Sequence, residues 1–283
     1  MTHIVYPTAD VAGAAAAPSP SIWKDCDVLG IIQNPGLGIH IYEDWRKMSI
    51  DATMNVDGTE QMGYTLVGDG GGTGLITPNT DLATAASRGI SHYFTMDTDT
   101  DQHDELGLQY AGGGETGTPL LRISKGGGRV WYETIIRLDD LTTGVPSVFV
   151  GLTDEQVIGG DHIVNGGAAL IATADLLGFF LKADDGDAFD CIYQTSGATM
   201  VTALAGDENI TESTWTKLGI TYDGNKTIMY WIDGVPVKAV DIDATGFPDG
   251  EEMLPSWVIK NVSDTTDITL NIGWWRAAWM YGP

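Results

Sequence analysis

The most concentrated group of acidic residues lies at positions 97–105, where Asp97, Asp99 and Asp101 alternate with threonines. Calcium prefers hard oxygen ligands, and carboxylates at alternate positions of a loop can wrap around one ion. The segment departs from the EF-hand pattern, because Gln102 stands where the sharp turn requires glycine. We therefore predict either a calcium site of another geometry on Asp97, Asp99 and Asp101 or a solvated acidic loop. The run Asp184–Asp187 allows the same two interpretations.

Other residue types that carry catalysis occur without the spacing that catalysis needs. The five histidines, at positions 3, 40, 92, 103 and 162, form no zinc-binding pair. The sequence has no Gly-x-Ser-x-Gly motif, and its glycine-rich stretches at 68–74 and 112–114 lack the lysine of a phosphate-binding loop. We therefore expect no catalytic residues and, calcium aside, no cofactor.

The C-terminal stretch is the most aromatic part of the sequence. It contains Trp274, Trp275, Trp279 and Tyr281. Such residues are enriched in subunit interfaces, and they also fill cores. If the stretch is the last core strand, simple alternation places Trp274 inward and Trp275 outward. We predict either that core strand or a subunit interface formed by Trp274, Trp275, Trp279 and Tyr281, with a platform for sugar stacking as a further alternative.

The composition excludes several classes of protein. The 283 residues carry a formal net charge of −25, so the surface would repel phosphate, and neither a nucleic-acid nor a membrane partner is expected. The most apolar run, at 166–181, is too short to span a bilayer and contains Asp175. The N-terminus lacks the basic region of a signal peptide. Cys26 and Cys191 are expected to be reduced thiols of a chain that folds in the cytosol, although the sequence does not show whether they could pair.

Residues 1–45 differ from the rest of the chain. The stretch Ala12–Ser21 is rich in alanine, serine and proline and has no period that would bury a face. We predict that residues 1–45 form an extended arm or linker, either flexible or ordered by lying across something else, such as a neighbouring subunit. Residues 46–283 are predicted to form one β domain.

Short alternating strands separated by turns dominate the β domain. Segments 130–138, 147–152, 227–232 and 268–273 are predicted strands, and Asp-Gly pairs at 223–224 and 233–234 are typical of hairpin turns. In the first strand, Glu133 and Arg137 share a face, and we expect them to pair on an exposed surface. The predicted fold is all-β, an antiparallel sandwich of two sheets.

The segment Trp215–Val237 resembles concanavalin A-like, laminin G-like jelly rolls. It has a tryptophan that opens a strand, a Tyr-Asp-Gly turn at 222–224, and a Tyr-x-x-Asp-Gly stretch at 230–234 ahead of Val237. The resemblance covers about residues 90–280 and implies a two-sheet jelly roll. That family includes lectins, glycan hydrolases and lyases, adhesion modules and virion surface proteins, and its fold does not choose among them. Its glucanases carry their catalytic carboxylates as Glu-x-Asp-x-x-Glu, and no glutamate here begins that motif.

The segment at 131–155 is similar to structural proteins of tailed bacteriophages. This resemblance favours a non-enzymatic capsid decoration (cement) protein that folds in the host cytoplasm and resides on the capsid surface of the virion. Its expected partners are the major capsid protein and neighbouring copies of itself in a homo-oligomer. The alternative is a glycan-binding, lectin-like adhesion module of a phage tail or cell surface.

Overall fold

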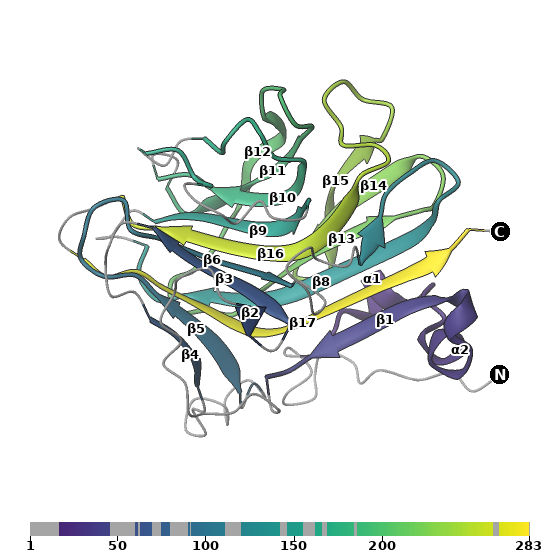
Figure 1. The fold of residues 1–283 in the computed structure, drawn as a ribbon, viewed down its shortest axis with the longest axis horizontal. Coiled ribbons are helices and arrows are strands. Elements are labelled where there is room, and N and C mark those ends of the chain that lie inside the picture. The colour runs from purple at the N-terminus through teal and green to yellow at the C-terminus, as the bar shows by residue number, and fades with distance from the viewer. Residues whose placement is uncertain are drawn as a thin grey trace.

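The computed structural model describes residues 17–45, 60–61, 63–69, 75–79, 90, 92–110, 120–141, 146–154, 162–165, 169–183, 186–262 and 266–282. Two antiparallel sheets, here called sheet A and sheet B, pack face to face in this part of the chain (Figure 1). No helix among the described residues is long and apolar enough to cross a membrane.

Sheet A has the strand order β15-β14-β13-β8-β17-β5-β4, and β1 pairs with β17 outside that path. Its strands are β1 (Gly38–Glu43), β4 (Leu75–Asn79), β5 (Tyr93–Asp97), β8 (Gly128–Leu138), β13 (Thr216–Tyr222), β14 (Thr227–Ile232), β15 (Val235–Asp241) and β17 (Thr269–Tyr281).

Sheet B has the order β12-β11-β10-β9-β16-β6-β3-β2, with β7 paired to β16. Its strands are β2 (Glu60–Gln61), β3 (Tyr64–Asp69), β6 (Glu105–Tyr110), β7 (Leu121–Arg122), β9 (Ser147–Thr153), β10 (Leu176–Leu181), β11 (Ala188–Gln194), β12 (Val201–Asn209) and β16 (Glu252–Lys260). Strands far apart in sequence are neighbours in both sheets, and the two-sheet jelly roll predicted from the sequence is confirmed.

The predicted hairpins are present in sheet A. β13, β14 and β15 form a meander whose two turns contain Gly224 and Gly234, both with positive φ. Asp223 fixes the first turn, because its Oδ1 accepts hydrogen bonds from the backbone N–H groups of residues 225, 226 and 227. Asp-Gly pairs therefore mark these turns because aspartate binds the backbone and glycine tolerates the left-handed conformation.

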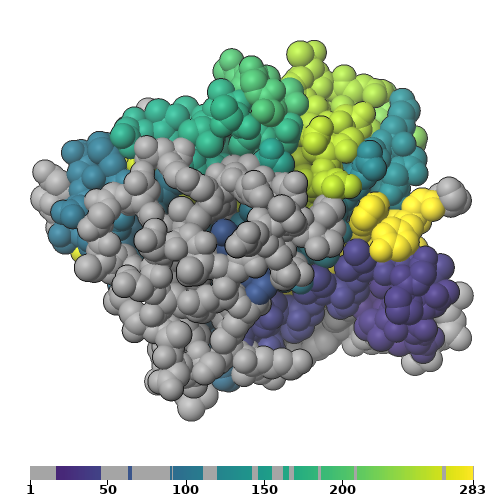
Figure 2. All heavy atoms as spheres, in the orientation of Figure 1, coloured from purple at the N-terminus to yellow at the C-terminus, as the bar shows by residue number. Residues whose placement is uncertain are grey.

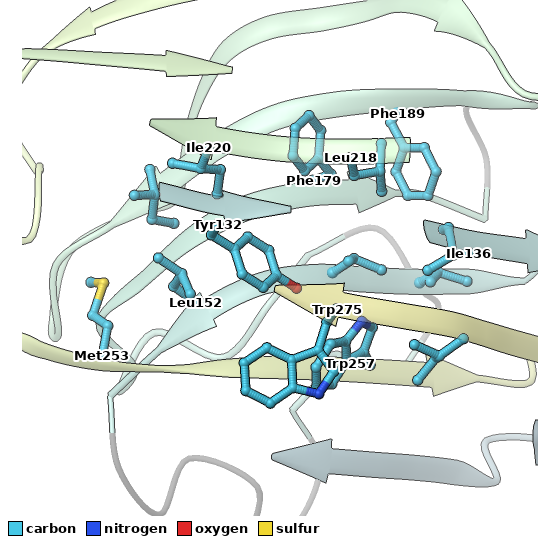
Figure 3. Packing of buried hydrophobic residues seen from close by; sticks show 14 of the residues in the cluster. Tyr132, Ile136, Leu152, Phe179, Phe189, Leu218, Ile220, Met253, Trp257 and Trp275 are labelled. Carbon is cyan, nitrogen blue, oxygen red and sulfur yellow. The ribbon is translucent and has the colours of Figure 1, made fainter. Parts of the chain in front are cut away.

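A large apolar core fills the space between the sheets. Tyr132 of β8 and Trp275 of β17 enter it from sheet A, and Phe179 of β10 and Trp257 of β16 enter it from sheet B (Figure 3). The indole rings of Trp257 and Trp275 lie 6.0 Å apart across the two sheets. Burial of this many aromatic side chains supplies the main driving force for closing the sandwich.

A β-bulge in β17 reverses the orientation predicted for two tryptophans. The pairing of β17 with β8 shifts register between Ile272 and Trp274. A Cβ atom on Gly273 would lie 2.9 Å from a methyl group of Ile135, so the tight bulge suits a glycine. As a result Trp275 points into the main core and Trp274 packs on the outer face of sheet A, so the simple alternation expected from the sequence was wrong here.

The described part of the predicted arm lies across the chain's own sandwich. It folds into α1 (Pro20–Trp23), α2 (Val28–Gln33), the 3-10 helix η2 (Pro35–Leu37) and β1, which pairs with β17. Figure 2 shows this segment, in purple, against the yellow end of β17. Ile22, Trp23 and Ile31 cover Trp131 and Ala278 on the outer face of sheet A. The segment therefore forms a second layer on that face.

The outer face of sheet B is also covered. Phe149, Phe180, Ile192 and Val258 project from it and pack against Ile163, Leu170 and Ala174 of the loop before β10 and against Leu176 at the start of that strand. The described part of this loop thus covers the outer face of sheet B and forms a second, smaller apolar cluster with it.

Candidate functional site: a groove beside the N-terminal segment

Glu133 is the most unusual side chain on the outer face of sheet A. It is fully buried, and both carboxylate oxygens accept a hydrogen bond from the backbone N–H of Ser19, at 3.1 and 3.0 Å. The indole Nε1–H of Trp23 donates to Oε2 at 2.6 Å. Burial raises the pKa of Glu133, while these donors and the charge of Lys217 lower it. The exposed pair with Arg137 expected from the sequence was wrong, since Arg137 pairs with Asp139 at 2.8 Å.

A groove of about 330 Å³ opens next to Glu133 and its partners, and its floor lies on sheet A. Trp131, Thr221, Met229 and Trp231 from β8, β13 and β14 line the floor. Trp231 is partly exposed, and its indole N–H donates to Thr221 Oγ1 at 2.9 Å, which fixes the orientation of the ring. The floor therefore offers a rigid aromatic face next to a thioether and a hydroxyl.

One wall of the groove comes from the N-terminal segment. Ser21, Ile22, Lys24 and Asp25 line it. Ser21 Oγ donates to the carbonyl of Gly234 at 2.6 Å, which ties this wall to the turn between β14 and β15. Residues 21–25 and 221–231 are thus brought together only by the docking of the segment.

Charged groups stand at the rim of the groove. The guanidinium of Arg129 lies 4.9 Å from the centre of the Trp131 ring and 4.0 Å from the carboxylate of Asp25. Asp223 and Lys24 also line the rim and are exposed. A largely apolar floor with a few charged and hydroxyl groups around it is the usual construction of a small-ligand site.

The second buried glutamate is held on the opposite side of the molecule. Glu105 of β6 lies on the outer face of sheet B, where it accepts from the backbone N–H groups of His162 and Ile163 at 2.6 and 2.9 Å and pairs with Lys260 at 3.3 Å. Burial raises its pKa to about 7, against the lowering effect of Lys260. Since the whole sandwich separates Glu105 from Glu133, they cannot flank one scissile bond.

The loop predicted to bind calcium is held largely by hydrogen bonds within the chain. Asp97 Oδ1 accepts from Thr269 Oγ1 at 2.7 Å, and Asp99 Oδ1 accepts from the backbone N–H of Asp101 at 2.9 Å. The residues that the structure describes include no group of three acidic, histidine or cysteine side chains arranged to hold a metal ion. Calcium binding by Asp97, Asp99 and Asp101 stays a prediction. The run at 184–187 lies partly outside the described residues.

The aromatic residues predicted for an interface have different surroundings. Trp274 and Trp275 are buried, and the indole N–H of Trp275 donates to the hydroxyl of Tyr64 at 2.8 Å. Trp279 is half-buried, and Tyr281 is 43% exposed, which leaves this end of β17 as the accessible part of the set. Whether it forms an interface stays a prediction. Cys26 and Cys191 are not joined by a disulfide in the structure.

Comparison with known proteins shows the fold. No family model matches the sequence, and no curated protein matches it. Similar solved structures include a protein of unknown function, SO2946, from Shewanella oneidensis MR-1, with a TM-score of 0.54 at 11% identity over 86% of this chain and 87% of that one. Peanut lectin gives 0.53 at 12% identity over 86% and 97%. A family 16 endo-glucanase from Bacteroides ovatus gives 0.51 at 10% identity over 84% and 99%.

The chain therefore has the concanavalin A-like jelly roll that lectins and family 16 hydrolases share. Identities of 10–12% show the fold alone, and none of the three structures is described as a virion protein. The groove was not predicted from the sequence, although the Trp215–Val237 motif does contain part of its floor.

Proposed function

We propose that this chain is a non-catalytic carbohydrate-binding module and that the groove beside the N-terminal segment is its binding site. The observation that carries the proposal is the fixed, partly exposed ring of Trp231 on a floor rimmed by Arg129, Asp25 and Lys24. A sugar ring has an apolar C–H face and polar hydroxyl edges, so it matches an aromatic surface surrounded by charged donors and acceptors.

The hydrogen bonds that the two buried glutamates accept within the chain support a binding role rather than hydrolysis. Glu133 and Glu105 each accept hydrogen bonds from backbone or indole N–H groups, and they lie on opposite outer faces. The jelly roll is shared by lectins and hydrolases, and binding modules use the fold without paired catalytic carboxylates.

Titration calorimetry with a panel of soluble polysaccharides (β-glucan, mannan, galactan and alginate) tests the proposal. At least one polymer should bind the wild-type protein, and Trp231→Ala should weaken that binding by about tenfold or more, the effect of losing a stacking aromatic. Tyr42→Ala is the matched control, because Tyr42 is 47% exposed and does not line the groove. Equal loss in both variants, or no binding by the wild type, would reject the groove as a glycan site.

Decoration of a bacteriophage capsid stays a separate prediction, because the groove does not bear on it. Deleting residues 1–16 tests it, because the deletion keeps Ala17, whose carbonyl accepts from Lys217 Nζ, and keeps Ser19 and Trp23, which donate to Glu133. A decoration protein that attaches through this segment should stop sedimenting with capsid shells, whereas a glycan module should keep its sugar affinity.

A further inference from the structure

We propose that Glu133 is a positioning residue for the groove: its carboxylate holds residues 17–26 against sheet A, and these residues form the wall that a ligand meets. The inference rests on the proposed function of the groove, and it names the interaction on which that site depends. Glu133 itself does not line the groove.

The carboxylate holds the segment at two points. Ser19 donates its backbone N–H to both oxygens, and Trp23 donates its indole N–H to one of them. The backbone N–H groups of Ile22 and Trp23 in turn donate to the carbonyl of Ser19 at 3.1 and 3.2 Å, closing the turn of α1. Fixing Ser19 and Trp23 therefore fixes the residues between and just after them, including Ser21, Ile22, Lys24 and Asp25 of the wall.

The residues around Glu133 leave room for the segment and contact it closely. Gly219 lies opposite Glu133 in the β13–β8 pair, and a Cβ atom there would approach Ile22 Cδ1 to 2.6 Å. A Cβ atom on Gly234 would lie 2.9 Å from Ser19 Oγ. Arg276, opposite Glu133 on β17, places its guanidinium 3.9 Å from the centre of the Trp23 ring. The two glycines thus allow the segment to pack closely on the sheet, and the guanidinium of Arg276 stacks on it.

A carboxylate suits this position better than its amide analogue does. An ionised carboxylate only accepts hydrogen bonds, whereas a glutamine would turn an NH₂ group toward part of this set of N–H donors. Hydrogen bonds to a charged acceptor are also about twice as strong as neutral ones. The substitution Glu133→Gln therefore weakens the docking of the segment while it leaves the size of the side chain nearly unchanged.

Hydrogen exchange of residues 17–26, measured beside glycan affinity, tests the inference. In Glu133→Gln and in Trp23→Phe we expect exchange in this peptide to rise by about tenfold or more, with a similar loss of affinity for the polysaccharide that binds the wild type. Glu252→Gln is the matched control, because Glu252 is exposed on β16 of the other sheet, and it should change neither quantity. All measurements are made well below the melting temperature of each variant.

The outcomes separate this inference from the proposed function. Unchanged exchange in both variants would show that Glu133 does not hold the segment, and faster exchange with unchanged affinity would show that the segment is not part of the site. Either result overturns the inference while Trp231→Ala still decides the function. If the wild type binds none of the polysaccharides, the proposed function fails, and with it the claim that Glu133 positions a ligand wall.

Discussion

The indole N–H of Trp23 donates to Glu133 Oε2 at 2.6 Å and so joins residues that are 110 positions apart in the sequence. This contact turns an N-terminal segment into a layer of the sandwich. It also buries a carboxylate that would otherwise lie on an open sheet face. The groove next to it exists only because the segment docks there.

Removing this hydrogen bond should cost stability. Trp23→Phe keeps most of the ring and deletes the donor to a charged acceptor, so we expect the free energy of unfolding to fall by about 1.5–3 kcal/mol. Trp279→Phe is the matched substitution, because its indole N–H donates to the neutral carbonyl of Gly127 at 2.9 Å, and it should cost only about 0.5–1.5 kcal/mol. Urea unfolding measures both, and an equal loss would contradict the charge-assisted role of Glu133.

The close approach of Ile22 to Gly219 predicts that a substitution at Ile22 offsets the destabilising effect of a substitution at Gly219. Gly219→Ala would place a methyl group 2.6 Å from Ile22 Cδ1 and should destabilise the protein by about 1–3 kcal/mol. Ile22→Val removes that same δ-methyl group, so the double variant should recover part of the loss. A double-mutant cycle measures the coupling, and strictly additive effects would show that the two residues do not meet.

Two buried titratable groups, Glu105 of β6 and His162 of the loop that covers sheet B, should give opposite pH dependences. Burial lowers the pKa of His162 to about 4, so its contribution to stability is present above its usual pKa of 6.5 and is lost as the pH falls toward 4. Burial raises the pKa of Glu105 from 4.5 to about 7, so its contribution is present below pH 4.5 and is lost as the pH rises through 7. Between about pH 4.5 and 6.5 the two slopes oppose each other.

Single variants should uncover these slopes. As the pH falls from about 6.5 to 4.5, the free energy of unfolding of His162→Phe should rise relative to that of the wild type by about 1.4 kcal/mol per pH unit. The free energy of unfolding of Glu105→Gln should rise relative to the wild type when the pH rises over the same range. His162→Phe also removes two buried ring nitrogens that have no hydrogen-bond partner among the residues that the structure describes. Thermal unfolding across this pH range checks the prediction, and parallel curves for wild type and variants would contradict it.

The sequence predicted the architecture where local chemistry determines it. The Asp-Gly turns at 223–224 and 233–234 depend on neighbouring residues, and these turns and the strands β8 and β14 lie where the sequence placed them. The environment of Glu133 could not be predicted in this way, because its partners Ser19 and Trp23 come from a distant, proline-rich segment with no strong local preference.

The site was missed for a related reason. The floor of the groove combines Trp131 with Thr221 and Trp231, which become neighbours only through the pairing of β8, β13 and β14. The orientation of Trp274 and Trp275 depended on one bulge at Gly273, and a bulge has no clear signature in an otherwise alternating strand. Pairing and register are long-range properties, so the single sequence carried no direct signal for them.

The most direct test of the proposed function follows the indole N–H resonance of Trp231 in a ¹H–¹⁵N spectrum during titration with an oligosaccharide of the best-binding polysaccharide. Trp231→Phe assigns the resonance, and the buried indoles of Trp257 and Trp275 provide internal references. We expect the Trp231 signal to shift in a saturable way while the two reference signals stay in place. A Trp231 signal that does not move, or shifts of the same size in all three, would contradict sugar binding in the groove.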